Sequence, residues 1–189
     1  DGSTTTCEPD GENSEGVPDV TFPTPEKWQD FKKGQFNIQF SRDPFSPLLK
    51  KYHSYNYVHP LKNSAGLSRG TVEDALIARP TKAKGKPASV NGTIQDVELP
   101  WTPGRDDIKS YLKTDKKGGR FAVNITESNH AVRSGFVIRS IIKSPSGNGW
   151  AVRTYGEGNH WAQAIPIVDG MANDYWERQT NELANGLRR

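Results

Sequence analysis

Residues 120–155, RFAVNITESNHAVRSGFVIRSIIKSPSGNGWAVRTY, decide the fold of this chain. Large apolar side chains alternate with polar ones in three runs of this stretch, a pattern typical of strands with one buried face. Residues 144–149, SPSGNG, separate the second and third runs and have the composition of a turn. We therefore predict a three-stranded antiparallel meander. Its core positions are Phe121, Val123, Ile125, Phe136, Ile138, Ile142, Trp150, Val152 and Thr154.

Short helices are predicted to pack against this sheet. Each one has a capping signal, such as Thr followed by Pro, or apolar residues at helical spacing. One layer of helices on one antiparallel sheet defines an α+β fold. The predicted helices begin near Thr24, Thr71, Thr102 and Ala172, and the last three end near Arg79, Lys113 and Ala184.

The N-terminal half is predicted to be rich in loops. Residues 1–21 have almost no large apolar side chain and are expected to be a disordered leader or linker. A single α+β domain is expected over residues 22–189. Within it, residues 35–62 are predicted to be mostly irregular, apart from a possible edge strand near residues 36–40, and residues 82–86 are predicted to form a flexible loop.

The composition restricts the class of protein. No window approaches about 18 consecutive apolar residues, so we expect no membrane-spanning helix. The single cysteine, Cys7, cannot form an internal disulfide or a cysteine-rich zinc site. The net charge of +3 permits a polyanionic partner without requiring one. Because the sequence starts with Asp rather than Met, we expect a processed product or the C-terminal piece of a longer chain.

The pairing of the second and third strands predicts where their charged residues lie. With a turn centred near Ser146, Ile142 would lie opposite Trp150 and Ser140 opposite Val152, which matches the apolar faces. The other face would then carry Arg139, Lys143, Arg153 and Tyr155. In this register Arg139 and Arg153 are close enough to bind one anionic group.

Two histidines are predicted to lie at one end of the meander. His130 precedes the second strand and His160 follows the third, which has returned antiparallel to the same end. Arg133 and the Gly156-Glu157-Gly158 triplet lie nearby. Histidine exchanges protons near neutral pH, and arginine binds phosphate in a bidentate manner. This group of residues suits metal-independent RNA cleavage, which needs a base, an acid and a cation at the phosphorane.

A second pair, His53 and His59, lies in a segment rich in tyrosine and lysine. Their six-residue separation does not match helical metal-ligand spacing, so packing is the favoured interpretation. Basic and aromatic residues also alternate in grooves that bind single-stranded nucleic acid, and that alternative stays open.

One part of this pattern resembles a known class of domains. The string from His130 through Gly135, Val137 and Arg139, then Gly149, Val152, Thr154 and residues 156–158, is similar to C-terminal domains of bacterial secreted polymorphic toxins. The resemblance covers about residues 130–158 and transfers no site residue. It implies an effector domain that is secreted or delivered into a target cell, commonly a nuclease, with a cognate immunity protein as a partner.

Our leading hypothesis is an exported, metal-independent ribonuclease that acts on an RNA substrate and needs neither cofactor nor metal. One alternative is a toxin that consumes NAD or transfers ADP-ribose, with Glu157 stabilising the oxocarbenium-like centre and Arg139 or Arg153 on the pyrophosphate. Another is a non-enzymatic module that binds carbohydrate or protein through its aromatic residues. The candidate catalytic residues are His130, His160, Arg133, Arg139, Arg153, Glu157 and Tyr155.

Overall fold

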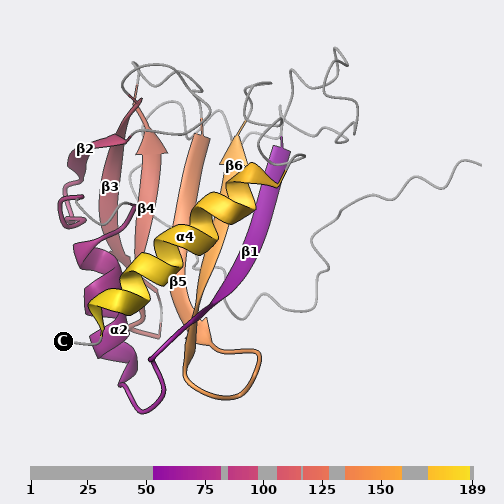
Figure 1. Cartoon of the computed structure of the whole chain (residues 1–189). Coiled ribbons are helices and arrows are strands. Elements are labelled where there is room, and N and C mark those ends of the chain that lie inside the picture. The colour runs from indigo at the N-terminus through magenta and orange to yellow at the C-terminus, as the bar shows by residue number, and fades with distance from the viewer. Residues whose placement is uncertain are drawn as a thin grey trace, which may run out of the picture.

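The structure is a computed structural model that describes residues 53–81, 85–97, 106–115, 117–127, 135–158 and 170–187. Six strands form one antiparallel sheet in the order β1-β6-β5-β4-β3-β2, and two helices lie together on one face of it (Figure 1). The elements are β1 (His53–Leu61), α2 (Arg69–Ala78), β2 (Thr93–Val97), β3 (Asp106–Thr114), β4 (Arg120–Thr126), β5 (Gly135–Lys143), β6 (Trp150–Gly158) and α4 (Met171–Gly186).

The predicted meander is confirmed as β4, β5 and β6, which are adjacent and antiparallel. The predicted C-terminal helix is confirmed as α4, in which the side chains of Tyr175, Trp176, Gln179 and Leu183 are buried. The α+β fold class is therefore correct. The leader, the helix near Thr24 and the edge strand near residues 36–40 lie outside the described residues.

Two segments differ from the prediction, and both are strands. Residues 53–61 form β1 instead of an irregular segment, and residues 106–114 form β3 instead of a helix. In both segments every second side chain points to the same face, and pairing with β6 or β4 satisfies the backbone hydrogen bonds. Tertiary pairing therefore overrides the local helix signal at Thr102.

Helix α2 was predicted correctly, with a start two residues earlier than expected. Ser68 is the N-cap, and its side chain accepts a hydrogen bond from the Thr71 backbone N–H at 3.1 Å. The helix ends at Ala78, just before Pro80, which cannot continue a helix.

The register between β5 and β6 is one residue away from the predicted one. Lys143 pairs with Trp150, and Arg139 pairs with Thr154. The connecting loop closes when the Ser144 N–H donates to the Gly149 carbonyl at 3.2 Å, and Gly149 adopts a positive φ of 73° there. A shift of one residue moves side chains to the other face, so the predicted shared face of Arg139 and Arg153 is wrong.

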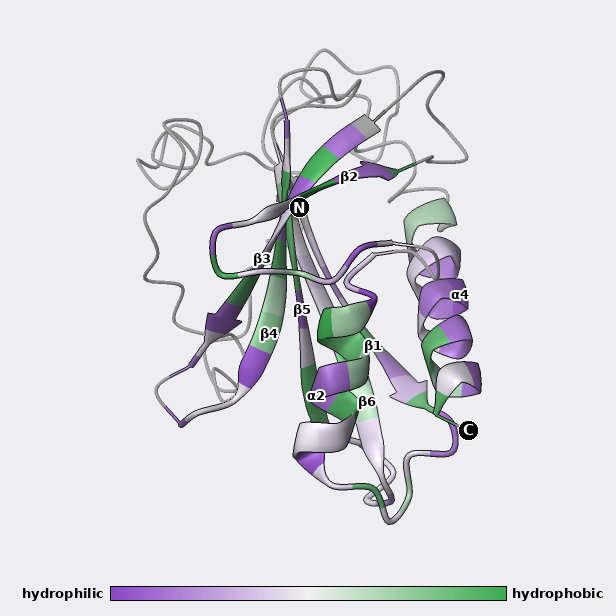
Figure 2. Ribbon diagram, turned by 90° about the vertical axis from the view of Figure 1, so that its left-hand side faces the viewer, coloured by the Kyte–Doolittle hydropathy of each residue, from purple (hydrophilic) through white to green (hydrophobic). Residues whose placement is uncertain are grey.

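Each face of the sheet carries a buried apolar core. Figure 2 shows α2 and α4 on the same side of the sheet, and the apolar residues Val72, Leu76 and Ile77 of α2 are buried. The core on this helix-covered face consists of Leu61, Val72, Leu76, Ile141, Val152, Leu183 and Ala184. The core on the opposite face consists of Phe121, Val123, Ile125, Phe136 and Ile138.

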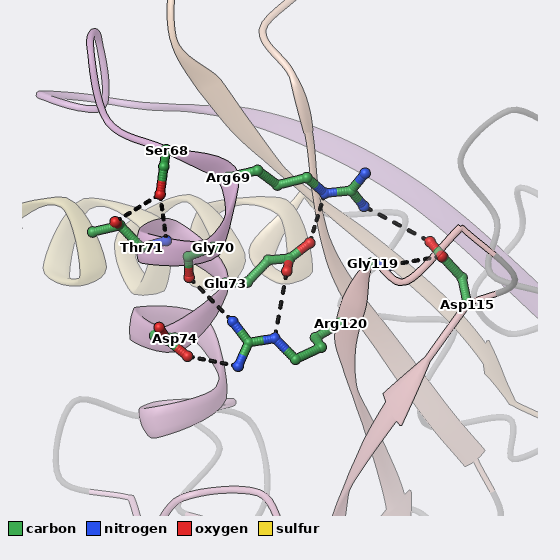
Figure 3. A network of polar contacts seen from close by, with 9 residues as sticks. All are labelled: Ser68, Arg69, Gly70, Thr71, Glu73, Asp74, Asp115, Gly119 and Arg120. Atoms are coloured by element: carbon green, nitrogen blue, oxygen red, sulfur yellow. Dashed lines mark hydrogen bonds and ion pairs between the residues drawn. The ribbon is translucent and has the colours of Figure 1, made fainter.

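A network of ion pairs fixes α2 to the turn between β3 and β4 (Figure 3). Glu73 is buried and lies between Arg69, at 2.6 Å, and Arg120, at 3.6 Å. Arg120 also contacts the exposed Asp74 at 2.7 Å, and Arg69 reaches Asp115 at 3.7 Å. Every carboxylate of this cluster has a cationic partner, so we interpret the cluster as structural.

Replacement of Glu73 by glutamine is expected to lower the free energy of unfolding by about 1–3 kcal/mol, because Arg69 and Arg120 both lose the buried carboxylate with which they pair. Asp74→Asn is the matched control. Asp74 binds the same Arg120 side chain but is largely exposed, so its loss should cost less than about 1 kcal/mol. Urea denaturation measures both values. Equal effects for the two variants would contradict the role given to burial.

Candidate functional site

At one end of the sheet, the end of β6 lies next to the starts of β5 and β1. The sequence predicted the proximity of β5 and β6 but not that of β1. Strand β6 ends at Gly158, whose Cα is paired with His53 at the start of β1 and with Gly135 at the start of β5. Neighbouring strands are about 5 Å apart. In Figure 1 the arrowheads of β4 and β6 point toward this end, which we call the histidine end.

The candidates His130, Arg133 and His160 lie outside the described residues, but the chain attaches all three to the histidine end. His160 follows Gly158 by two residues, and Arg133 precedes Gly135 by two residues. Two residues of extended chain span at most about 7 Å. His130 precedes Gly135 by five residues, which corresponds to at most about 18 Å.

The candidates Arg153 and Tyr155 of β6 lie on the face of the sheet opposite the helices, and Glu157 is two residues farther along the strand. Glu157 is next to the strand end and pairs with Ser54 and Phe136. Tyr155 packs against the Phe136 ring at 6.2 Å and is part of the core on that face. Glu157 is therefore the β6 candidate at the histidine end.

Arg153 lies far from the histidine end, although the hypothesis placed it on the phosphate beside His130 and His160. It is five residues from Gly158, about 16 Å along the strand. Its Nε donates to Asn56 Oδ1 at 2.9 Å, and partial burial lowers the pKa of Arg153. This arginine is oriented by β1 rather than toward the histidine end.

Residues 156–158 are the last residues of β6. The Tyr55 ring lies directly over Gly156, and any Cβ at that position would collide with it. Tyr55 thereby reaches α4, where its hydroxyl accepts a hydrogen bond from Trp176 Nε1 at 3.1 Å. Glycine is required here for close packing.

Arg139 was predicted to lie on the face of the sheet away from the core, and this prediction is wrong. Its side chain is 1% exposed and lies under α4 on the helix-covered face. It donates to the Pro80 carbonyl and to Thr180 Oγ1, both at 3.3 Å, and its guanidinium carbon lies 5.2 Å from the centre of the Trp176 ring. Arg139 therefore cannot share an anion with Arg153, which lies on the other face.

Lys143 is also on the helix-covered face, at the end of the sheet remote from Gly158. Its Nζ lies 4.0 Å from the centre of the Trp150 ring. The predicted surface of three cations on one face of the sheet is thus divided between two faces and two ends.

The histidines of β1 do not form a pair. His59 is buried, and its Nε2 lies 3.1 Å from Asn173 Oδ1 of α4, which supports the packing interpretation for this residue. His53 is six residues away, about 20 Å along the strand, at the histidine end. Sequence reasoning missed this position of His53. The alternation of Tyr55, Tyr57, His59 and Leu61 was the signal that could have found it.

Two tyrosines lie close to Arg139 in the layer between the sheet and α4. Burial raises the pKa of Tyr55 well above its ordinary value, and burial raises the pKa of Tyr175 to about 12. Burial also lowers the pKa of Arg139 to about 10. At neutral pH the arginine is therefore charged and both phenols are neutral.

The raised pKa of Tyr175 predicts a loss of stability in alkali. The folded protein keeps this proton where the unfolded chain releases it, so the contribution is full below about pH 10 and is lost toward pH 12. In Tyr175→Phe the free energy of unfolding should fall less steeply across this range, by on the order of 1 kcal/mol per pH unit. Urea denaturation at fixed pH checks this. A difference between the two proteins that is independent of pH would contradict it.

Two further observations concern the described part of the chain. Its His, Cys, Asp and Glu residues form no group of three or more that could hold a metal ion. Neither α2 nor α4 has the length and hydrophobicity that are needed to cross a membrane.

Comparisons with known proteins give a distant structural likeness. No family model matches the sequence, and no curated protein matches it. The solved structure of XoxI from Bacillus cereus matches with 12% identity and a TM-score of 0.44, covering 73% of this chain and 98% of XoxI. An uncharacterised protein from Bacillus thuringiensis matches with 11% identity and a TM-score of 0.41, covering 73% of this chain and 99% of that protein. At this level of similarity the matches carry no argument about function.

Proposed function

We propose that this chain is a metal-independent ribonuclease whose active site lies at the histidine end. The observation that supports this most directly is the pairing of Gly158 with both His53 and Gly135, because it joins to one end of the sheet the segments that carry His130, Arg133 and His160. The assignment of phosphate binding changes as a result. Arg133 replaces Arg139, which is buried, and Arg153, which is remote.

The proposed reaction uses the two loop histidines as proton carriers. One imidazole takes the proton from the ribose 2′-hydroxyl, whose oxygen then forms a bond to phosphorus. The other histidine, in its charged form, donates a proton to the 5′-oxygen as the bond from phosphorus to that oxygen breaks. The products are a 2′,3′-cyclic phosphate and a free 5′-hydroxyl. Arg133 stabilises the charge on the phosphorane through bidentate hydrogen bonds.

The delivery context is part of the same proposal. The resemblance to secreted polymorphic toxins supports an exported effector that acts inside a target cell, with an immunity protein as inhibitor. The net charge of +3 is compatible with an RNA substrate.

The other two hypotheses receive less support from the geometry. The NAD hypothesis placed pyrophosphate on Arg139 or Arg153, and the burial of Arg139 leaves only Arg153 for that role. A carbohydrate platform needs exposed indole rings. Trp176 is 7% exposed, and Trp150 Nε1 donates to the Leu67 carbonyl at 2.9 Å, so both rings belong to the packed layer.

The test is to incubate the folded protein with RNA and, separately, with NAD, both in the presence of EDTA, and to analyse the products by mass spectrometry. The proposal expects RNA fragments that end in 2′,3′-cyclic phosphate, with NAD intact. Turnover of NAD with intact RNA would establish the alternative toxin activity. Intact RNA and intact NAD would overturn the enzymatic assignment altogether.

A further inference from the structure

The layer between the sheet and α4 contains a buried cation that no carboxylate neutralises within the described part of the chain. Arg139 is 1% exposed, and the described ion pairs involve Arg69 and Arg120 but not Arg139. Buried charges in proteins are normally paired with an opposite charge or bound to a ligand. Arg139 therefore needs an explanation beyond packing.

The hydrogen bonds of Arg139 leave part of its guanidinium without a partner. One terminal nitrogen donates to the Pro80 carbonyl and the other to Thr180 Oγ1, whereas Nε has no partner. The residue directly across the strand pair is Thr154, whose side chain is fully buried and whose Oγ1 has no partner either. Two unpaired donors thus lie on neighbouring strands and on the same face.

The groups around these donors supply little negative charge. Tyr55 and Tyr175 are neutral at neutral pH because burial raises the pKa of both phenols. The Pro80 carbonyl, two residues beyond the end of α2, contributes only the dipole of a single peptide group. The local field is therefore positive and largely uncompensated.

We propose that Arg139 Nε and Thr154 Oγ1 together bind a small monovalent anion under α4. Arg139 and Thr154 are directly paired on adjacent strands, where Cβ atoms are about 4.5–5.5 Å apart, so one small ion can accept hydrogen bonds from both donors. Both side chains are fully buried, which excludes a ligand as large as a nucleotide. The site is separate from the histidine end, because Arg139 is four residues, about 13 Å, from Gly135. The proposal stands independently of the ribonuclease assignment.

A ligand at this position would stabilise the folded state by mass action, since the unfolded chain has no such site. It would also neutralise Arg139 beneath Trp176, the α4 residue that covers the guanidinium. The anion would therefore fasten α4 to the sheet and act as a structural ligand.

The experiment replaces sodium gluconate by sodium bromide at constant ionic strength and follows the melting temperature of the full chain. Bromide is small enough to accept from both donors at once, whereas gluconate is too large for a fully buried position. Salts also act nonspecifically on stability, so the comparison is made between wild type and Thr154→Val, which keeps the shape and removes the hydroxyl. Thr114→Val, at an exposed position of β3, is the matched control.

We expect a saturable rise in the wild-type melting temperature relative to Thr154→Val, with the apparent bromide affinity lowered at least tenfold in that variant and unchanged in Thr114→Val. A crystal grown in bromide should show an anomalous peak within hydrogen-bond distance of Arg139 Nε. Identical bromide responses in wild type and Thr154→Val, together with the absence of that peak, would overturn the site and leave a polar layer without a bound anion.

Discussion

Replacement of Arg139 by alanine is expected to lower the free energy of unfolding by about 2–5 kcal/mol, although the arginine has no acidic partner among the described residues. The side chain fills the space between the centre of the sheet and α4, and its removal leaves a cavity under Trp176. The same change removes the donors to the Pro80 carbonyl and to Thr180 Oγ1. Urea denaturation monitored by circular dichroism measures the loss.

Arg139→Met separates packing from charge. Methionine keeps an unbranched side chain of similar reach and removes the cost of burying a cation, so this variant should stay within about 2 kcal/mol of wild type. If alanine and methionine lower the free energy of unfolding equally, the loss of the hydrogen-bonded cation dominates over the cavity. If neither variant changes it by more than about 1 kcal/mol, the packing role described for Arg139 is wrong.

The position of Arg139 shows what the sequence could and could not predict about the sheet. The alternation at Phe121, Val123 and Ile125 predicted strands because it has a period of two residues. Alternation alone does not fix the register of a hairpin, since shifting the pairing by one residue gives another regular pattern. The glycine loop before Trp150 determines that shift through the positive φ angles of Gly147 and Gly149. These angles are properties of the folded turn.

Strand β3 shows a second limit. Ile108, Tyr111 and Leu112 have helical spacing, while Ile108, Ser110 and Leu112 also fit a strand with one face toward the helices. Whether this segment forms a helix or a strand depends on its pairing with β4, which its own sequence does not contain. Strand β4 offers Ala122 and Asn124 opposite Leu112 and Ser110, and Ser110 Oγ donates to Asn124 Oδ1 at 2.6 Å. Tertiary contacts of this kind are absent from any local pattern.

Topology alone determines which strand ends flank the candidate site, whereas side-chain faces depend on the register as well. An antiparallel third strand must return to the end at which the second began, so the attachment of His130 and His160 to one end required only the order of the strands. Assigning Arg139 and Arg153 to a shared surface required the register as well, and that assignment failed. His53 was missed because its segment was predicted to be irregular.

Replacement of His160 by alanine is expected to lower RNA cleavage in EDTA by about 10²–10⁴-fold, the range typical for the loss of a general acid or base. His130→Ala should have an effect of similar size, because each histidine carries one of the two proton transfers. His59→Gln is the matched control. It changes the buried histidine that contacts Asn173, far from the histidine end, and should retain cleavage. Circular dichroism confirms that each variant is folded.

The pH dependence of cleavage distinguishes catalysis from a structural role for these histidines. A reaction that needs one neutral and one charged imidazole has a bell-shaped dependence of kcat/KM on pH. Removal of the base should abolish the fall on the acidic side, and removal of the acid should abolish the fall on the alkaline side. A uniform decrease, with both limbs kept, would mean that His160 acts only through the fold. Loss of one limb in His160→Ala and of the other in His130→Ala would assign the base and the acid individually.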